Sequence, residues 1–162
     1  MNIRKATQED LSEILKIYEH ARKFMALHGN PNQWGKTNPP VERVKQDIAE
    51  QKCHLCIQDK EIAGVFYFAQ EEDSTYQKIN GAWLSNRPYA VVHRIAVGAN
   101  HSGVATYCLN WAYEQYHNIR IDTHEDNIPM QHLLKKLGFS YCGEITIADG
   151  SPRIAFQKEE KH

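Results

Sequence analysis

The residues whose types and spacing point most clearly to ligand binding form one continuous stretch, Arg94-Ile-Ala-Val-Gly-Ala-Asn-His-Ser-Gly-Val-Ala-Thr106. Here the pattern of a buried strand passes through small residues directly into the pattern of a helix. The first amides of a helix have no intrahelical acceptor, and the helix dipole adds partial positive charge, so a diphosphate placed there gains several hydrogen bonds. Gly103 and Ala105 keep bulky side chains away from that backbone. Taken alone, the stretch fits a diphosphate site and an ordinary strand-to-helix turn equally well.

The elements around this stretch mix helices and strands. Apolar residues at steps of three and four, with capping or stop signals at the ends, predict helices over residues 7–28, 38–48, 104–116 and 127–137. Runs rich in β-branched and aromatic residues predict strands over residues 1–5, 54–58, 62–69, 89–97, 119–123, 141–147 and 153–158. The strand Tyr89–Val97 is apolar on both faces, which indicates a central position. The order predicts an α/β (α+β) fold with residues 1–162 as a single domain.

Composition narrows the classes of function. Lys and Arg together number 19 and Asp and Glu number 20, and the net charge of -1 gives no broad attraction to nucleic acid or to anionic membranes. No apolar run is long enough to cross a bilayer, and the polar start of the chain is not a signal-peptide core. We therefore expect a cytoplasmic protein with neither nucleic acid nor a membrane as its partner.

Two of the four cysteines form the pattern Cys53-His-Leu-Cys56. No second pair of Cys or His stands at zinc spacing, so we expect no metal site. A separation of three residues on a strand instead sends the two side chains to opposite faces of a sheet, where each packs as a small apolar group.

The stretch that ends at Thr106 resembles motif A of the GNAT superfamily of N-acetyltransferases, written Arg/Gln-x-x-Gly-x-Gly/Ala. Gly103 and Ala105 match this motif, whereas Asn100 stands where the family has Arg or Gln. The helix Asn127–Leu137 with the following Gly138-Phe139 resembles the second half of the family pattern. The order of elements from Met1 to Ala69 is similar to that of the family's amino-terminal arm, so the resemblance covers nearly the whole chain.

More narrowly, several segments resemble a group of bacterial members of the family with no assigned substrate. These segments are Phe24-Met25 with Gly29-Asn30 and Gln33-Trp34, His93-Arg-Ile-Ala-Val97, and Asp122-Thr-His-Glu-Asp-Asn127.

The resemblance implies a mixed central sheet that is splayed between its fourth and fifth strands, with helices on both faces and acetyl-CoA as co-substrate. The pantetheine arm would enter the gap between the strands that end at Val97 and Thr123, and amides from His101 to Thr106 would hold the diphosphate. Asn100 and His101 replace the family's Arg or Gln and Gly, so one charged phosphate contact is missing. The cofactor-binding residues implied in this way are Ile95, Ala96, Val97, His101, Ser102, Gly103, Val104, Ala105, Thr106 and Asn127.

Acetyl transfer to an amine requires a neutral nitrogen, whereas an alkylamine with a pKa of about 10.4 is mostly protonated at neutral pH. His93 is our first candidate for the base, because a histidine with an ordinary pKa of about 6.5 is mostly neutral in the cytoplasm. A packed core histidine is the alternative. His124, Glu125 and Asp126 could guide the amine, or they could simply cap the following helix.

The family's frequent tyrosine acid would fall at Leu134, which cannot donate a proton. Tyr141 is the first replacement that we consider, with an ordinary packed strand tyrosine as the alternative.

In this family the acceptor pocket is built by the first two helices and the loop between them, which implies Phe24, His28 and Trp34 as substrate-binding residues. Aromatic groups there favour a small amine with an apolar body, although packing of Trp34 in the core is equally consistent with the sequence. The function so implied is N-acetylation of a primary amine on a small molecule or peptide. The alternatives are a non-catalytic acyl-CoA sensor and a protein-interaction domain. Members of the family often pair as homodimers.

Overall fold

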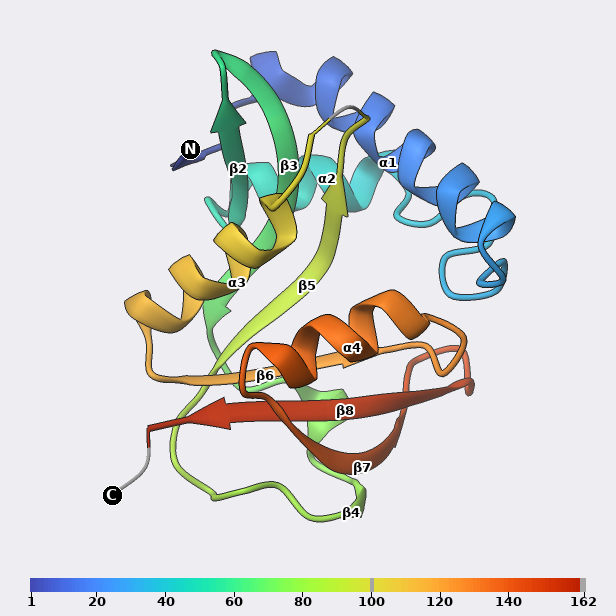
Figure 1. Cartoon of the computed structure of the whole chain (residues 1–162), viewed down its shortest axis with the longest axis vertical. Helices are drawn as coiled ribbons and strands as arrows, with labels where there is room; N and C mark the ends of the chain where they lie inside the picture. The colour runs from blue at the N-terminus through green and yellow to red at the C-terminus, as the bar shows by residue number, and fades with distance from the viewer. Residues whose placement is uncertain (100, 161–162) are drawn as a thin grey trace.

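The computed structural model describes residues 1–99 and 101–160, so Asn100 lies outside the described residues. Figure 1 shows a sheet with α1 and α2 near the upper end of the molecule and α4 lying across the lower half. The helices are α1 (Leu11–Leu27), α2 (Val41–Ala49), α3 (Val104–Gln115) and α4 (Ile128–Lys136), and short 3-10 turns lie at η1 (Gln8–Asp10) and η2 (Ser74–Tyr76). The strands are β1 (Asn2–Lys5), β2 (Cys53–Gln58), β3 (Glu61–Gln70), β4 (Asn80–Gly81), β5 (Ala90–Val97), β6 (Asn118–Thr123), β7 (Ser140–Thr146) and β8 (Pro152–Glu159).

The predicted helices and strands are confirmed, with ends that differ by a few residues. The second helix begins at Val41 and not at Asn38, because Pro40 adopts an extended conformation at the N-cap. Among the described residues, no helix is both long and apolar enough to cross a membrane.

In the described part of the chain the strands form one eight-stranded sheet in the order β1-β2-β3-β5-β6-β8-β7-β4. Neighbouring strands are antiparallel except for β5 and β6, which are parallel. These two strands pair only at Ala90 with Ile119 and at Val91 with Arg120, and they separate beyond those residues. The predicted splay between the fourth and fifth strands is therefore confirmed.

The sheet is covered by helices on both faces. One core cluster joins α3 and α4 to the sheet and includes Cys56 and Leu134, and a second cluster joins α1 and α2 to the sheet and includes Cys53. The two cysteines thus pack on opposite faces, as their spacing predicts. Full burial of each Leu, Ile or Phe side chain in such clusters contributes about 1.5–3 kcal/mol.

A third cluster, with residues of β3, β5, β7 and β8, was not predicted. It contains Tyr67 and Tyr76, with Trp83 and Tyr89 packed against it. Arg120 of β6 lies between the rings of Trp83 and Tyr89, at 4.1 and 4.0 Å from their centroids. The polar segment between β3 and β5 therefore packs on the sheet through its aromatic residues, Tyr76, Trp83 and Tyr89.

Candidate active site

The start of α3 presents its backbone as an anion site. Gly103 precedes the helix with a φ of 73°, a conformation that glycine adopts without strain. The Tyr107 amide donates to the Gly103 carbonyl at 3.1 Å, so the amides of the preceding turn have no acceptor within the helix. A Cβ atom on Gly103 would meet only the Met1 Cε, at 4.0 Å. The space in front of this backbone therefore suits a diphosphate.

Strand β5 contains one extra residue at the point where it leaves β6. Tyr67 pairs with His93 and Val65 pairs with Ala96, so two steps on β3 oppose three on β5. Arg94 lies in this bulge with a φ of 50°, which is strained for a residue other than glycine.

Side-chain contacts hold the strained backbone of Arg94. Its guanidinium donates two hydrogen bonds to the Asp47 carboxylate, at 2.9 and 3.0 Å, and lies 4.6 Å from the centroid of the Tyr67 ring. Its carbonyl accepts a hydrogen bond of 2.8 Å from the Tyr18 hydroxyl. Residues from α1, α2 and β3 thus fix the shape of β5 beside the gap.

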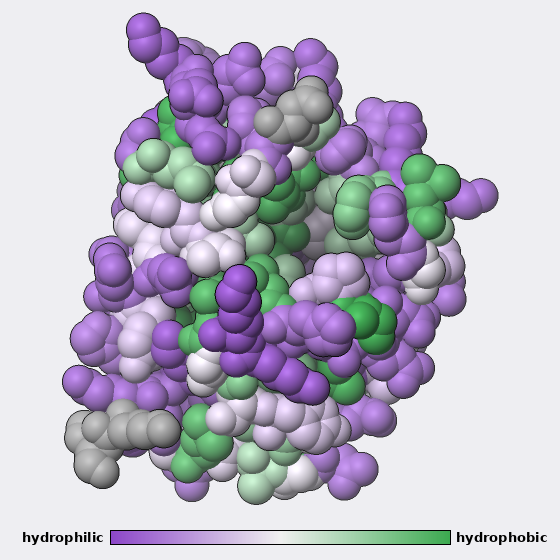
Figure 2. Space-filling model, viewed as in Figure 1, coloured by the Kyte–Doolittle hydropathy of each residue, from purple (hydrophilic) through white to green (hydrophobic). Residues whose placement is uncertain are grey.

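A cleft of about 780 Å³ runs along the gap between β5 and β6, and we call it the central cleft. Its lining includes Tyr67, from the third cluster, and also Val92 and Met130, which belong to the α3–α4 core. The cleft therefore reaches residues from both sides of the sheet. On the face in Figure 2, apolar side chains gather in the hollow between α3 and α4.

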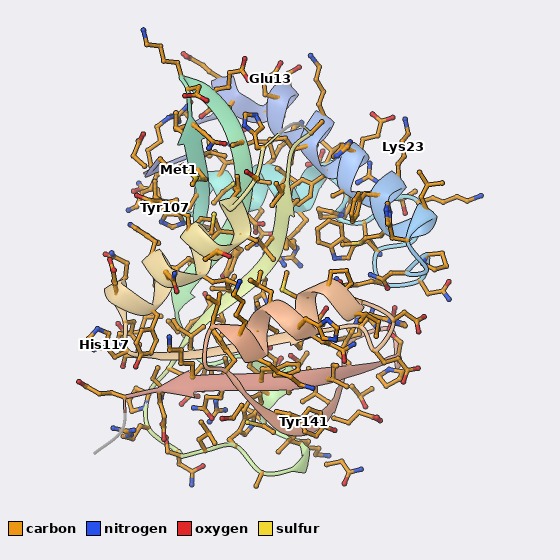
Figure 3. The ribbon with its side chains drawn as sticks, in the orientation of Figure 1. Met1, Glu13, Lys23, Tyr107, His117 and Tyr141 are labelled. Atoms are coloured by element: carbon orange, nitrogen blue, oxygen red, sulfur yellow. The ribbon has the colours of Figure 1, made fainter. Side chains whose placement is uncertain are left out.

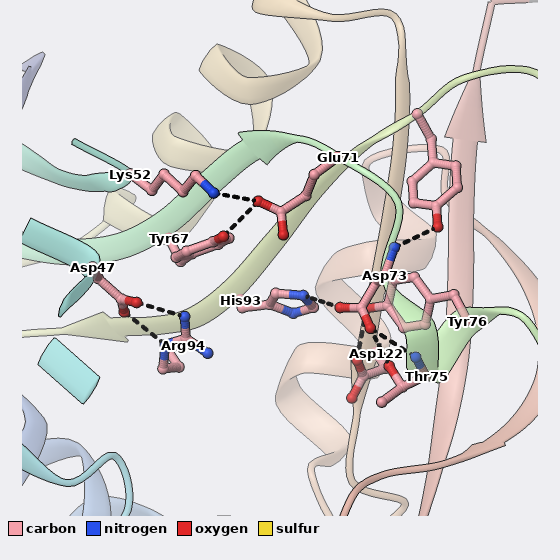
Figure 4. A network of polar contacts seen from close by, with 11 residues as sticks. Asp47, Lys52, Tyr67, Glu71, Asp73, Thr75, Tyr76, His93, Arg94 and Asp122 are labelled. Carbon is pink, nitrogen blue, oxygen red and sulfur yellow. Dashed lines mark hydrogen bonds and ion pairs between the residues drawn. The ribbon is translucent and has the colours of Figure 1, made fainter. Parts of the chain in front are cut away.

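A polar network lines one wall of the central cleft (Figure 4). The Nε2 atom of His93 lies 2.7 Å from Oδ2 of Asp73, and Tyr76 donates a hydrogen bond of 2.7 Å to Asp122. Burial raises the pKa of Asp73, but hydrogen bonds from His93 and Thr75 outweigh it and hold the pKa at about 2. Burial also raises the pKa of Asp122.

The cofactor-binding residues that we predicted lie around the gap in different ways. Ile95 and Asn127 line the central cleft, whereas the side chain of Val104 is buried and leaves only its backbone for a ligand. His101 and Ser102 line a smaller hollow of about 380 Å³, where Nδ1 of His101 lies 2.9 Å from Oε1 of Gln58.

The loop between α1 and α2 contributes Gln33 to the lining of the central cleft. The side-chain oxygen of Gln33 accepts a hydrogen bond of 2.9 Å from Asn127, and the backbone carbonyl of Gln33 accepts one of 2.9 Å from Arg153. Asn127 also caps α4, since its side chain accepts a hydrogen bond from the Met130 amide. Asn127 therefore connects the loop between α1 and α2 to the start of α4.

The predicted acceptor residues separate into two groups. Trp34 lines the central cleft and also packs edge-on against Tyr18, with ring centroids 5.5 Å apart, so it contacts both the cleft and the core. Phe24 and His28 stack on each other at 3.9 Å, and neither belongs to the cleft lining. Met25, which follows Phe24 on α1, does line it.

Tyr141 is not brought to His93. It is 58% exposed on β7, packs against Phe156 and does not line the central cleft, and Figure 3 shows it at the end of the molecule away from α1. Leu134 is fully buried. His124 accepts a hydrogen bond of 3.0 Å from the Asp126 amide, which fits a local capping role.

Asp73 and Asp122 were not predicted as partners of His93 at this site. Asp73 lies in a polar segment without periodicity, and no local signal places it beside His93. Asp122 stands on a predicted strand, and the sequence gives no local sign that it lines the cleft and accepts a hydrogen bond from Tyr76.

The comparisons with known proteins agree with this geometry. Residues 1–140 match the model of an acetyltransferase (GNAT) domain. A GNAT-family acetyltransferase of Streptococcus agalactiae 2603 is similar over 99% of this chain and 96% of that chain, with 32% sequence identity and a TM-score of 0.90. No protein of curated function matches the sequence.

Two further solved structures are similar in fold. A protein of Staphylococcus aureus Mu50, provisionally named an acetyltransferase, is 25% identical, with a TM-score of 0.74 over 99% of this chain and 100% of that chain. A protein of Salmonella typhimurium, also provisionally named an acetyltransferase and solved with its cofactor acetyl-CoA, is 14% identical, with a TM-score of 0.65 over 99% of this chain and 95% of that chain. From the family match and the Streptococcus agalactiae structure, the chain belongs to the GNAT family of acetyltransferases.

Proposed function

We propose that this protein transfers the acetyl group of acetyl-CoA to a primary amine of a small molecule or peptide, and that residues 1–162 act as a single acetyltransferase domain. The observation that carries the proposal is the separation of β5 from β6 beside the uncapped amides of α3. The acetyl-CoA bound to the Salmonella protein of the same fold supports the choice of acyl donor.

Backbone groups bind most of the acetyl-CoA in this proposal. Amides from His101 to Thr106 hold the diphosphate, and the backbone of Ile95, Ala96 and Val97 pairs with the pantetheine arm in the gap. Asn127 contacts the same arm after its side chain exchanges Gln33 for the ligand. The bound thioester supplies the activated acyl group and its thiolate leaving group.

His93 removes a proton from the acceptor ammonium in this proposal. It lines the central cleft and has a fixed carboxylate partner in Asp73, so the ring is held beside the place where the amine must arrive. Trp34 and Met25 border the acceptor side in this proposal, and Phe24 and His28, which lie outside the cleft lining, keep their predicted role in acceptor binding. We assign the leaving thiolate no acid from the cleft, because water can protonate a thiolate whose thiol has a pKa of about 8.5. Tyr141 stays a prediction for this step.

Calorimetry with acetyl-CoA, followed by measurement of CoA release with a panel of amines, tests the proposal. The panel contains polyamines, amino acids, aminoglycosides and peptides with a free amino terminus. A saturable heat of binding and turnover of at least one amine are expected. Absence of any binding to acetyl-CoA would end the proposal.

A pair of glycine variants tests the diphosphate site. Gly103 and Gly29 both have positive φ values, and a Cβ atom would meet little at either position. Gly103→Glu adds a negative charge beside the diphosphate, so its affinity for acetyl-CoA should fall by at least about tenfold. Gly29→Glu carries the same change of charge and conformation, and it should bind acetyl-CoA within about twofold of the native protein.

The buried Leu134, where the family pattern has a proton donor, keeps a non-catalytic acyl-CoA sensor as the second candidate. The two functions share the binding site and differ in turnover. Binding of acetyl-CoA without CoA release on any amine of the panel favours the sensor.

A further inference from the structure

We propose that Asp73 is a positioning residue that fixes His93 as the Nε2–H tautomer and so reserves Nδ1 as the proton acceptor. The inference rests on the proposed function, because it assigns the nitrogen of His93 that receives the proton of the acceptor amine. Asp73 lies outside the motifs of the sequence.

Asp73 is held by donors on both of its carboxylate oxygens. Oδ1 accepts hydrogen bonds from the amide and the hydroxyl of Thr75, at 2.9 and 2.6 Å, and Oδ2 lies 2.7 Å from Nε2 of His93. The backbone amide of Asp73 donates to the Tyr89 hydroxyl at 2.9 Å. With its pKa at about 2, the carboxylate is ionised at neutral pH and can only accept, so Nε2 of His93 must be the donor.

The other nitrogen of His93 is the one that remains for a substrate. Among the described residues, Nδ1 of His93 makes no hydrogen bond, and the residue lines the central cleft. Tyr67 and Tyr76 flank the ring, with centroids at 5.6 and 5.9 Å. These contacts restrict rotation of the ring and keep Nε2 on Asp73.

Other charged groups near His93 come from three elements. Asp122 on β6 is close enough for the charge of His93 to lower its pKa, although burial raises that pKa more strongly. Arg153 on β8 acts on Asp122 in the same direction as His93. Arg94, the next residue on β5, is paired with Asp47. An imidazolium at His93 would thus lie near two acidic side chains, Asp73 and Asp122.

The acceptor ammonium gives one proton to Nδ1 of His93, which yields a neutral amine and an imidazolium. The lone pair of the amine forms the C–N bond at the thioester carbonyl, and the C–S bond breaks with its electron pair on sulfur. The second proton of the nitrogen then passes to the thiolate through water, and His93 returns its proton to solvent.

The hydrogen bonds of Thr75 make the substitution Asp73→Asn diagnostic. The backbone amide of Thr75 can only donate and needs an oxygen opposite it, so the Asn side chain of the variant must direct its NH₂ group at Nε2 of His93. Nε2 then has to accept, and the ring proton moves to Nδ1, where it blocks the base. Asp73→Ala removes the partner without imposing the wrong tautomer. Asp73→Asn should therefore be the more damaging substitution, whereas a merely structural role predicts the opposite order.

Long-range ¹H–¹⁵N spectra of the imidazole nitrogens read the tautomer without any substrate. His93→Gln identifies the signal of His93 by its loss. The native protein should give the Nε2–H pattern and Asp73→Asn the Nδ1–H pattern. Thr75→Val, which removes the hydroxyl but keeps the amide donor, should retain the native pattern. A native Nδ1–H tautomer, or an unchanged tautomer in Asp73→Asn, would overturn the proposal.

Kinetics of the same variants connect the tautomer to catalysis. At pH 7 we expect kcat/KM to fall by about 100-fold or more in Asp73→Asn and by about tenfold in Asp73→Ala, with acetyl-CoA affinity unchanged in both. Equal activity of Asp73→Asn and the native protein would refute the role of Asp73 and leave the enzyme intact. A native protein that turns over no amine would refute the proposed function, and the spectra would still decide the tautomer.

Discussion

At the scale of single residues, the acidic side chains near His93 come from segments that are distant in sequence. Asp73 comes from the segment after β3, and Asp122 comes from β6 on the other side of the gap. A histidine with a purely structural role needs a hydrogen-bond partner for one ring nitrogen, but it does not need to line a cleft. His93 has a fixed partner on one nitrogen and a cleft beside it, which is the arrangement that the proposed role as general base requires.

Replacing His93 by glutamine tests this arrangement. The amide NH₂ of glutamine can still donate to Asp73, so the fold and the acetyl-CoA affinity should be preserved. Turnover should fall by about 10²–10⁴-fold at pH 7, because the variant has no base at the site. The control is His20→Gln on the exposed face of α1, which should match the native protein. Equal turnover of both variants would remove His93 from the mechanism.

Arg94 contributes through its backbone as well as its charge. Its φ of 50° carries about 1–3 kcal/mol of strain for a residue with a Cβ atom, and the ion pair with Asp47 offsets that strain. Both Arg94→Ala and Arg94→Gly remove the ion pair, but only glycine relieves the strain. In urea unfolding, Arg94→Gly should therefore be more stable than Arg94→Ala by about 1 kcal/mol. Equal stabilities would mean that the bulge is not strained in solution.

At the scale of elements, Gly64 on β3 sets how closely α3 approaches the sheet. A Cβ atom on Gly64 would lie 2.6 Å from Cγ1 of Val104, the first residue of α3, and 3.2 Å from the Ala96 carbonyl oxygen. Val104 is buried and β-branched, so neither group can move freely. The glycine thus lets the helix start next to β5, where its amides reach the gap.

Gly64→Ala should destabilise the protein by about 1–3 kcal/mol, because the added methyl group forces α3 away from β3. Thermal unfolding measures the loss, and calorimetry should detect weaker binding of acetyl-CoA. Gly98→Ala is the matched control for stability, since its Cβ atom would meet the Ala63 carbonyl oxygen at 3.5 Å, an ordinary contact. A Gly64→Ala protein as stable as Gly98→Ala would contradict this account of the helix position.

The start of α1 depends on a carboxylate whose effect should vary with pH. The Asp10 carboxylate accepts hydrogen bonds from both terminal nitrogens of the Arg4 guanidinium, each at 2.9 Å, and from the Thr7 amide, at 2.8 Å. The hydrogen bonds from Arg4 are the main reason that the pKa of Asp10 falls from its ordinary value of 3.8 to about 2. The unfolded chain therefore binds the proton at a higher pH than the folded protein does.

From this sign, the stability that Asp10 contributes is complete above about pH 4 and is lost as the pH falls towards about 2. Asp10→Asn should lower the free energy of unfolding by about 1 kcal/mol at pH 7, and the difference from the native protein should shrink in acid. Thermal unfolding at several pH values measures it. Glu13→Gln, which alters an exposed ion pair with Lys16, should show little change, and a pH-independent difference for Asp10→Asn would refute the assignment.

Local patterns predicted most of the elements, because helix and strand periodicity and caps act within a few residues. The turn between β2 and β3 needs no glycine, since Asp59 and Lys60 adopt φ values of 52° and 66°. The gap and the start of α3 follow from the family resemblance of the stretch around Gly103. The polar wall of the cleft does not follow from the resemblance. Asp73 reaches His93 only when the segment between β3 and β5 packs on the sheet through its aromatic residues.

At the scale of the whole molecule, the protein consists of two parts that meet at the gap. The strands β1, β2, β3 and β5 lie on one side, and β6, β8, β7 and β4 lie on the other. In the sheet the two sides share only two register pairs between β5 and β6. Gln33 adds a bridge through Asn127 and Arg153. A ligand that enters the gap therefore contacts both parts and should couple them.

Acetyl-CoA should accordingly stabilise the junction more than the rest of the molecule. At a concentration 100 times its dissociation constant, a ligand that binds only the folded state adds about 2.7 kcal/mol to the free energy of unfolding. Hydrogen–deuterium exchange should slow most in peptides that cover residues 92–97 and 101–107, where the ligand pairs with the backbone. Peptides from β7, at the far side of the sheet, serve as the internal control and should change little under native conditions. Equal protection of these peptides and of β7, or protection confined to β7, would mean that the ligand binds elsewhere. The gap between β5 and β6 would then have no role in the proposed reaction.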